Sequence, residues 1–399
     1  MPLGRLIFCA CVISLGFTPA GRAIAQDPSA ASKDPSAKTQ ATLSPAAVAT
    51  ARRSIQRGLA YLRSSEDRDG GWATKGYGPA VTALVAQAFA RDPGYGPKHP
   101  VIERSLAHIW KYEQSDGGVY DRRQNLANYQ SSVVLSFLAT LDDPALSNRV
   151  KRLQSFLTQL QYDGEENIPE SDPWYGGAGY NRTKRPDLSN TQMMLEALHA
   201  SGLPKDSPVY QRALTFVSRC QMNEATNDQE FAKGVTDGGF IYSPNDGGES
   251  KANPIIELTK TQRISYGSMT YSGFKSMLYA NVSRDDPRIQ ACLKWIRHNY
   301  TLDVNPGLQG RHAEEGLYYY LHVFARALSE WGDPIVVDDK GVSHNWRLDL
   351  IRKLASLQQK DGSWVNEKTR WLEGEESYVT ALAILSLQAA LEQESSESR

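Results

Sequence analysis

The stretch LDLIRKLASLQQKDGSW at residues 348–364 contains the plan on which the whole chain is built. Its leucines and isoleucine recur at helical spacing, with charged residues between them, which predicts an amphipathic helix. Asp361-Gly362 predicts a tight turn, and Trp364 places a large apolar side chain beside it. The apolar residues at 378–391 then predict a second helix that is buried on nearly every side.

The same plan occurs six times in the chain. Each unit predicts an amphipathic helix, a glycine-containing turn with an aromatic residue, and a helix that is apolar around most of its circumference. The apolar second segments are residues 80–90, 131–141, 191–200, 267–282, 319–331 and 378–391.

These two kinds of helix need different surroundings. An amphipathic helix needs one face in solvent, whereas a helix that is apolar all round must be enclosed. An inner ring of six apolar helices inside an outer ring of six amphipathic ones satisfies both. We therefore predict an all-α fold, an α6/α6 toroid with a single barrel, over residues 45–391. An open solenoid is the alternative, but it needs polar repeats at both ends, and the last apolar segment is as apolar as the others.

The two ends of the chain have a different composition. Residues 1–25 combine Arg5, a short apolar run and Ala23-Ile24-Ala25, as in a cleaved signal peptide, and predict a periplasmic or extracellular protein. An uncleaved anchor is the alternative, and no later run is long enough to span a membrane. Residues 26–44 predict a disordered linker, and residues 392–399 a polar tail.

The charge balance argues against one class of function, and the cysteine content argues against two kinds of stabilising site. The 44 Lys and Arg residues balance 45 Asp and Glu residues, which argues against nucleic-acid binding. Beyond the signal peptide, Cys220 and Cys292 are too few for a disulfide framework or a cysteine-rich zinc site. We expect them to be buried thiols, with one long-range disulfide as the alternative.

Several units share a more detailed pattern: a basic residue, a small one, an aromatic, an aliphatic, then Gln and Gly-x-Trp. The matching residues are Arg212, Ala213, Phe216, Val217 and Gln221 in one unit, Gln358, Gly362 and Trp364 in the last, and Arg57, Gly58, Tyr61, Leu62, Gly70 and Trp72 in the first, where Glu66 replaces Gln. These units resemble the repeats of squalene–hopene and oxidosqualene cyclases and of protein prenyltransferase β subunits. The resemblance implies a toroid with an apolar central cavity.

The acid motif that the resemblance implies is altered here. The cyclases have Pro-Asp-x-Asp-Asp-Thr, whose middle Asp protonates an alkene, whereas this chain has Pro186-Asp187-Leu188-Ser189-Asn190-Thr191. A serine hydroxyl is far too weak an acid for that step. We therefore do not expect squalene-type protonation at this site, and Asp187 remains a candidate base or helix cap.

The zinc site of the prenyltransferases is also missing. Residues 266–271 have neither Asp nor Cys, and His322 is displaced from the expected position. Since a catalytic zinc needs three protein ligands, we expect no metal and no cofactor.

Polar side chains on the apolar segments are the remaining candidates, because burying them costs free energy unless they are paired or used. His322 and Arg326 share a helix face, and so do Glu196 and His199. The candidate catalytic residues are Asp187, Tyr271, Tyr319 and His322, and the candidate ligand-binding residues are Asn190, Tyr266, Lys275, Tyr320 and Tyr378. Each could instead be a satisfied polar residue between the two rings.

These observations leave three functions open. The first is binding of an apolar, isoprenoid ligand in the central cavity. The second is binding of a protein or glycan without catalysis, and the third is carbohydrate chemistry in the barrel. An enclosed aromatic cavity favours the first, a filled centre the second, and a groove with facing carboxylates the third. The long segment at residues 241–265 is expected to cap one mouth of the barrel.

Overall fold

We describe a computed structural model in which residues 41–72, 78–252 and 263–396 are placed. All of these belong to one compact unit, Gln40–Arg399. The expected signal peptide, most of the linker and residues 253–262 of the expected capping segment lie outside the described residues. No helix in the described ranges is long and apolar enough to cross a membrane.

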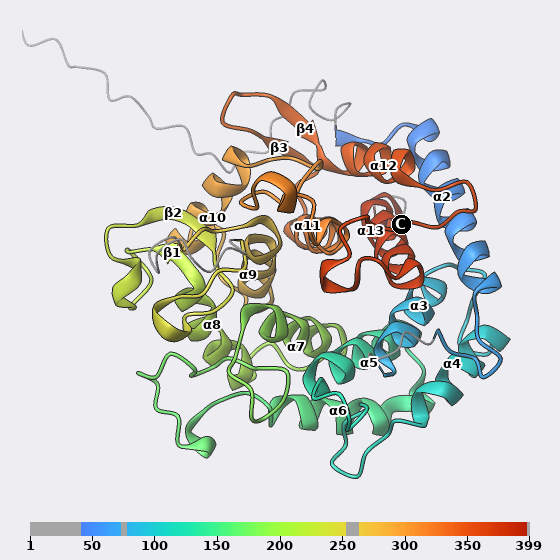
Figure 1. The fold of residues 1–399 in the computed structure, drawn as a ribbon, viewed down its shortest axis with the longest axis horizontal. Helices are drawn as coiled ribbons and strands as arrows, with labels where there is room; N and C mark the ends of the chain where they lie inside the picture. Colours follow the sequence, from blue (N-terminus) through green and yellow to red (C-terminus); the bar gives the residue numbers. More distant parts are fainter. Residues whose placement is uncertain (1–40, 73–77, 253–262, 397–399) are drawn as a thin grey trace, which may run out of the picture. The chain divides into compact units, whose positions relative to one another are not determined.

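In the part of the chain that the structure describes, twelve α-helices alternate between an outer and an inner ring (Figure 1). The outer helices are α2 (Pro45–Ser64), α4 (Pro100–Trp110), α6 (Ser147–Thr158), α8 (Pro208–Cys220), α10 (Pro287–His298) and α12 (Trp346–Leu357). The inner helices are α3 (Ala80–Ala90), α5 (Ala127–Leu141), α7 (Leu188–Ala200), α9 (Gly267–Tyr279), α11 (Leu317–Trp331) and α13 (Glu376–Ser396). The fold is therefore the predicted α6/α6 toroid.

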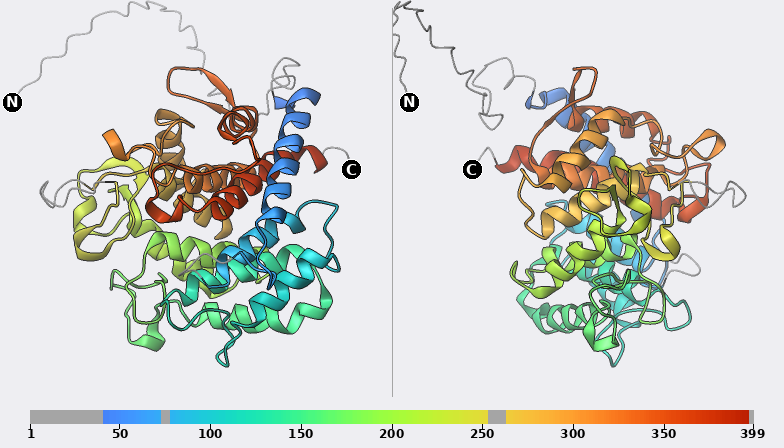
Figure 2. Two further views of the ribbon diagram at one scale, coloured as in Figure 1. Left: turned by 45° about the vertical axis from the view of Figure 1, so that its right-hand side comes forward. Right: turned by 90° about the vertical axis from the view of Figure 1, so that its left-hand side faces the viewer.

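The inner ring is closed. Each inner helix packs against the next one along the chain, and α13 packs against α3, so the last inner helix meets the first. Figure 1 shows this ring face-on, and Figure 2 shows the same helices after the molecule is turned by 45° and by 90°. The open solenoid is therefore wrong.

Burial follows the sequence pattern that predicted the two rings. In the inner helix α3 every side chain except those of Gln87 and Ala90 is buried. In the outer helix α8 the buried apolar side chains follow helical spacing and form one stripe, made of Val209, Tyr210, Ala213, Phe216 and Val217. A stripe of this kind packs inward while the opposite face stays in solvent.

The inner helices run parallel to one another. Near their N-terminal ends, Asn128 of α5 donates through Nδ2 to the carbonyl oxygen of Asn190 in α7 at 3.3 Å. Near their C-terminal ends, Arg326 of α11 bonds Glu196 of α7. The barrel therefore has one mouth formed by helix starts and another formed by helix ends.

The repeat residues themselves close the outer ring. Gln358, after α12, donates through Nε2 to the carbonyl oxygen of Ser54 in α2 at 2.9 Å, and Arg57 donates through Nη1 to Gln358 Oε1 at 3.1 Å. The ring of Trp364 is buried against Gly58, where a Cβ would lie only 2.8 Å from the indole. The small residue of the repeat thus makes room for the tryptophan of the preceding unit.

Similar bonds join other neighbouring outer helices. Gln161 donates through Nε2 to the carbonyl oxygen of Val209 in α8 at 3.0 Å. In the first unit, Glu66 stands where the repeat has Gln, and it accepts two hydrogen bonds from Arg104 of α4, at 2.7 and 2.8 Å. Where other units have the amide of Gln, the carboxylate of Glu66 therefore forms a bidentate ion pair with Arg104.

The third unit departs from the predicted turn. Asp163-Gly164 was expected to provide it, but Gly176 has the left-handed backbone, with φ +82°, and lies against the carbonyl of Arg212. Gly164 instead begins a short 3₁₀ turn. The chain between them forms a longer loop before α7 begins.

Smaller elements decorate the rings. Two antiparallel hairpins pair β1 (Gln221–Asn223) with β2 (Thr236–Phe240) and β3 (Ile335–Val337) with β4 (Ser343–Asn345). The 3₁₀ turns are Pro144–Leu146, Gly164–Glu166, Glu230–Ala232, Asn245–Gly247, Gly310–His312 and Arg370–Leu372. Helix α13 continues to Ser396, past residue 392 where the polar tail was expected to begin. Cys220 and Cys292 are buried free thiols.

A glycine substitution tests the closing junction. Gly362 has φ +100°, and a Cβ there would lie 2.5 Å from the carbonyl oxygen of Arg57. We expect Gly362→Ala to lower the free energy of unfolding by about 3 kcal/mol, through backbone strain and this clash. Urea denaturation measures the change. Gly164→Ala is the control, because nothing lies within 4 Å of a Cβ at Gly164. Equal stability of the two variants would contradict the tight closure.

Candidate functional site

A narrow cavity lies on the axis of the inner ring. Its lining comes from helices α3, α5, α7, α11 and α13, and from Arg91 directly after α3. The lining residues are Leu84, Gln87, Arg91, Tyr129, Val133, Ser136, Met193, Glu196, Tyr319, His322, Arg326, Tyr378, Leu382 and Leu385. Only about 40 Å³ of this space can hold the centre of a water molecule. One water needs about 10–15 Å³ of such space, so the cavity has room for a few waters.

Tyrosine side chains dominate the half of the cavity nearest the helix starts. The hydroxyl of Tyr319 lies 3.2 Å from Ser189 Oγ and accepts a hydrogen bond from Gln192 Nε2 at 3.3 Å. Burial raises the pKa of Tyr319 to about 12, so the hydroxyl keeps its proton. Tyr378 also lines this cavity, as does Tyr129, which sequence reasoning did not single out.

Asp187 caps helix α7 rather than facing the cavity as a free acid. Its carboxylate accepts hydrogen bonds from the backbone N–H of Asn190 at 2.8 Å and from Asn190 Nδ2 at 2.9 Å. Burial raises the pKa of Asp187 to about 6, although the bonds from Asn190 act in the opposite direction. This is the helix-cap role that the sequence allowed.

The position of the cyclase acid is occupied by Ser189. Its Oγ lies beside Tyr319, at the start of the axial cavity, and it offers only a hydroxyl there. The neighbouring carboxylate of Asp187 is turned into the cap of α7. The site therefore keeps the helix start of the cyclase motif without an acid at its middle position.

Glu373 is a second buried carboxylate, and sequence reasoning missed it. It accepts a hydrogen bond from the backbone N–H of Tyr319 at 2.7 Å and one from Asn366 Nδ2 at 2.6 Å. Burial raises the pKa of Glu373 to about 7, against the effect of these bonds. Glu373 thus satisfies the start of α11, much as Asp187 satisfies that of α7.

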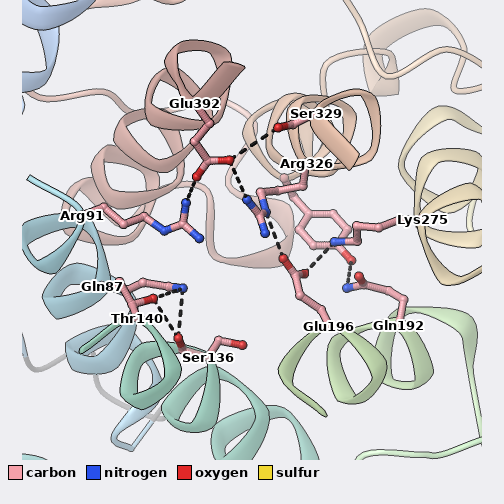
Figure 3. A network of polar contacts seen from close by, with 11 residues as sticks. Gln87, Arg91, Ser136, Thr140, Gln192, Glu196, Lys275, Arg326, Ser329 and Glu392 are labelled. Atoms are coloured by element: carbon pink, nitrogen blue, oxygen red, sulfur yellow. Dashed lines mark hydrogen bonds and ion pairs between the residues drawn. The ribbon is translucent and has the colours of Figure 1, made fainter. Parts of the chain in front are cut away.

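Charged side chains gather at the other end of the cavity, where the inner helices end (Figure 3). Lys275 is fully buried on α9 and its Nζ lies 2.6 Å from Glu196 Oε2. Arg326 contacts the other oxygen of Glu196 through Nε at 3.1 Å. Burial opposes the charged form of Glu196, but Lys275 and Arg326 hold its pKa far below the usual range.

A second carboxylate extends this network to the rim. Glu392 of α13 forms ion pairs with Arg91 and, at 3.4 Å, with Arg326. Glu392 also accepts a hydrogen bond from Ser329 Oγ at 3.4 Å. All six inner helices send at least one of the side chains drawn in Figure 3 toward this centre.

His322 lies between the tyrosines and the charged network. Burial lowers its pKa to about 3, and the positive charges of Lys275 and Arg326 add to this effect, while Glu196 opposes it. The imidazole is therefore neutral at physiological pH. Its Nδ1 is buried without a hydrogen-bond partner among the described residues. The shared helix face predicted for His322 and Arg326 does line the cavity.

Other predicted site residues lie beside the cavity rather than on its wall. Tyr271 and Tyr320 pack edge-on against each other between α9 and α11, with ring centroids 5.8 Å apart, and Tyr320 donates to the carbonyl oxygen of Thr301 at 2.7 Å. Tyr266 is buried at the start of α9. His199 stacks on Tyr279, at 4.4 Å between centroids, and does not line the cavity.

No cluster of His, Cys, Asp and Glu with the makings of a metal site occurs in the part of the chain that the structure describes. Tyr266 and Ser268 occupy the start of α9, where the prenyltransferases have zinc ligands. His322 lines the axial cavity, whereas neither Cys220 nor Cys292 does.

Comparison with known proteins supports the fold. No protein-family model matches the sequence, and no curated protein matches it either. Among solved structures, the chain is similar to the type II terpene cyclase MstE from Scytonema without ligand, with a TM-score of 0.53 and 12% identity over 87% of this chain and 99% of that one. A variant of MstE bound to its substrate, geranylgeranyl dihydroxybenzoate, aligns with a TM-score of 0.51 and 11% identity over 88% of this chain and 99% of that one.

A glycoside hydrolase is similar to the same degree. The family 76 mannosidase Bt3792 from Bacteroides thetaiotaomicron VPI-5482 has a TM-score of 0.51 and 11% identity, over 87% of this chain and 100% of that one. Together these neighbours confirm the α/α-toroid fold. At such low identity they show the fold alone.

The raised pKa of Asp187 gives a testable pH dependence. The folded protein binds this proton more tightly than the unfolded chain, whose Asp has a pKa of 3.8. The resulting stabilisation is complete below pH 4 and is lost as the pH rises through about 6. Between pH 4 and 7, wild type should therefore lose on the order of 3 kcal/mol relative to Asp187→Asn. Urea unfolding across this range measures the difference, and parallel stability curves would contradict the assignment.

Proposed function

We propose that this protein is exported and binds an apolar, isoprenoid-type ligand in the central cavity of its toroid. The observation that carries the proposal is the composition of the cavity wall. Leu84, Val133, Met193, Leu382 and Leu385 supply apolar surface to the axial cavity. Tyr129, Tyr319 and Tyr378 add aromatic surface near the helix starts. Binding sites for apolar ligands are concave and have a mostly apolar wall of this kind.

The ligand must widen the cavity in order to bind. The cavity now has room for a few waters, which is too little for an isoprenoid chain such as the fifteen-carbon chain of farnesol. Met193 is unbranched and has three rotatable bonds, so its side chain adapts to a new neighbour at little cost. An apolar chain that displaces such side chains recovers contact with the leucines around them.

Any reaction in this cavity would differ from alkene protonation by a carboxylic acid. The groups on the wall nearest the tyrosines are the neutral hydroxyl of Tyr319 and the neutral imidazole of His322. Neither is acidic enough to protonate an isolated double bond. The proposal is therefore a binding function, with Tyr319 and His322 as the groups that would contact the ligand.

The carbohydrate alternative has less support. A glycosidase needs one carboxylic acid with a raised pKa facing a second carboxylate. The carboxylates of the charged network, Glu196 on the cavity wall and Glu392 at the rim, are both in ion pairs with basic side chains. The pKa of Glu196 is lowered by those charges, which is unfavourable for an acid catalyst.

Cavity filling tests the proposal. We expect purified protein to bind farnesol in isothermal titration calorimetry, and Met193→Phe to weaken binding at least tenfold because the phenyl ring takes the remaining space. Leu214→Phe is the matched control, since it adds the same ring on the outer helix α8. Thermal unfolding verifies that both variants are folded. No binding by wild type, or equal weakening by both variants, would refute the cavity as the binding site.

Export has its own test. Expression of the full chain in a bacterial host should yield a periplasmic or secreted protein whose N-terminus is Gln26. N-terminal sequencing of the purified product identifies the cleavage site. A cytoplasmic product that retains Met1 would contradict this part of the proposal.

A further inference from the structure

Cations outnumber carboxylates among the ion-paired side chains described at the helix-end side of the cavity. Arg91, Lys275 and Arg326 are positive, and Glu196 and Glu392 are negative. The exposed carboxylate of Glu330 also acts on Lys275 from the rim. His322 is neutral beside them. Partly buried cations that outnumber the carboxylates paired with them favour an additional anion.

Two hydrogen-bonding groups in the same region are also unused. The Nε of Arg91 and the Nδ1 of His322 are buried, and neither has a partner in the described part of the chain. Both residues line the axial cavity. Since a buried polar atom without a partner costs free energy, each is suited to contact a ligand that enters this space.

We infer that the ligand of this cavity carries a carboxylate head group, which binds among Arg91, Arg326 and His322. The inference rests on the proposed function, because the head group occupies one end of the same cavity. A carboxylate brings one negative charge to ion pairs in which cations outnumber carboxylates. It also accepts paired hydrogen bonds from a guanidinium. A diphosphate would bring several charges and leave the buried cluster with an excess of negative charge.

The exposure of the network sets the direction of the ligand. The side chain of Glu392 is 41% exposed and that of Arg91 is 21% exposed, so solvent reaches this end of the cavity. Tyr129 and Tyr378 line the opposite part, toward the helix starts. The ligand therefore places its apolar chain among the tyrosines and keeps its carboxylate near the open end. This orientation avoids carrying the charge past the apolar wall.

A comparison of head groups on one chain tests the inference with the unmodified protein. Farnesol, farnesoic acid and farnesyl diphosphate share the same fifteen-carbon chain and differ in charge. In isothermal titration calorimetry at pH 7.5, we expect farnesoic acid to bind at least tenfold more tightly than farnesol and than farnesyl diphosphate. Raising the salt concentration should weaken the binding of farnesoic acid less than it weakens an ion pair on the protein surface, since the site is partly buried.

A charge variant then locates the head group. Arg91→Gln removes one of the three cations and should weaken the binding of farnesoic acid about tenfold while changing that of farnesol less than twofold. Arg284→Gln is the matched control, because it removes an exposed arginine that pairs with Asp333 on the surface. Equal affinity of acid and alcohol would overturn the head-group inference and leave the proposed function standing. Tightest binding of the diphosphate would also overturn it, whereas no binding of any of the three would overturn the proposed function itself.

Discussion

The contact between α13 and α3 is the constraint on which the rest of the structure depends. It turns a row of helical hairpins into a closed ring, and it gives every inner helix two inner neighbours and a common axis. The helices of the ring separate side chains on the axis from the solvent around the sides of the barrel. Charged residues there must find partners across the barrel, as Glu196 does with Lys275 and Arg326. Closure therefore creates both the apolar cavity and the buried charge network beside it.

Much of the fold could be predicted from the sequence because each repeat contains the residue pattern of two helices and of the turn between them. The apolar runs correspond to the inner helices, and Gln358, Gly58 and Trp364 lie at the junction that closes the ring. The turn of the third unit could not be predicted. Asp163-Gly164 has the right composition, but the choice of Gly176 depends on its close packing against Arg212 of the next outer helix. That contact is not visible in a local pattern.

The site was less predictable, for two physical reasons. Inner helices are apolar on all sides, so the sequence does not show which face meets the axis; Tyr319 faces it, whereas Tyr271 and Tyr320 pack between helices. Arg91 and Glu392 each follow directly after an apolar run and look like helix ends in solvent. Their pairing joins positions 301 residues apart and exists only because the ring closes. Spacing did reveal His322 and Arg326, since residues four apart lie on the same face of a helix whichever direction that face points.

The most direct test of the account is a crystal structure of the protein grown with farnesoic acid. We predict continuous density for the chain on the barrel axis between Tyr129 and Tyr378, with the carboxylate in contact with Arg91 or Arg326 and with His322 Nδ1. Density confined to the outer surface, around an axis still closed by Met193 and the tyrosines, would contradict the claim that this toroid is built to enclose an amphipathic ligand.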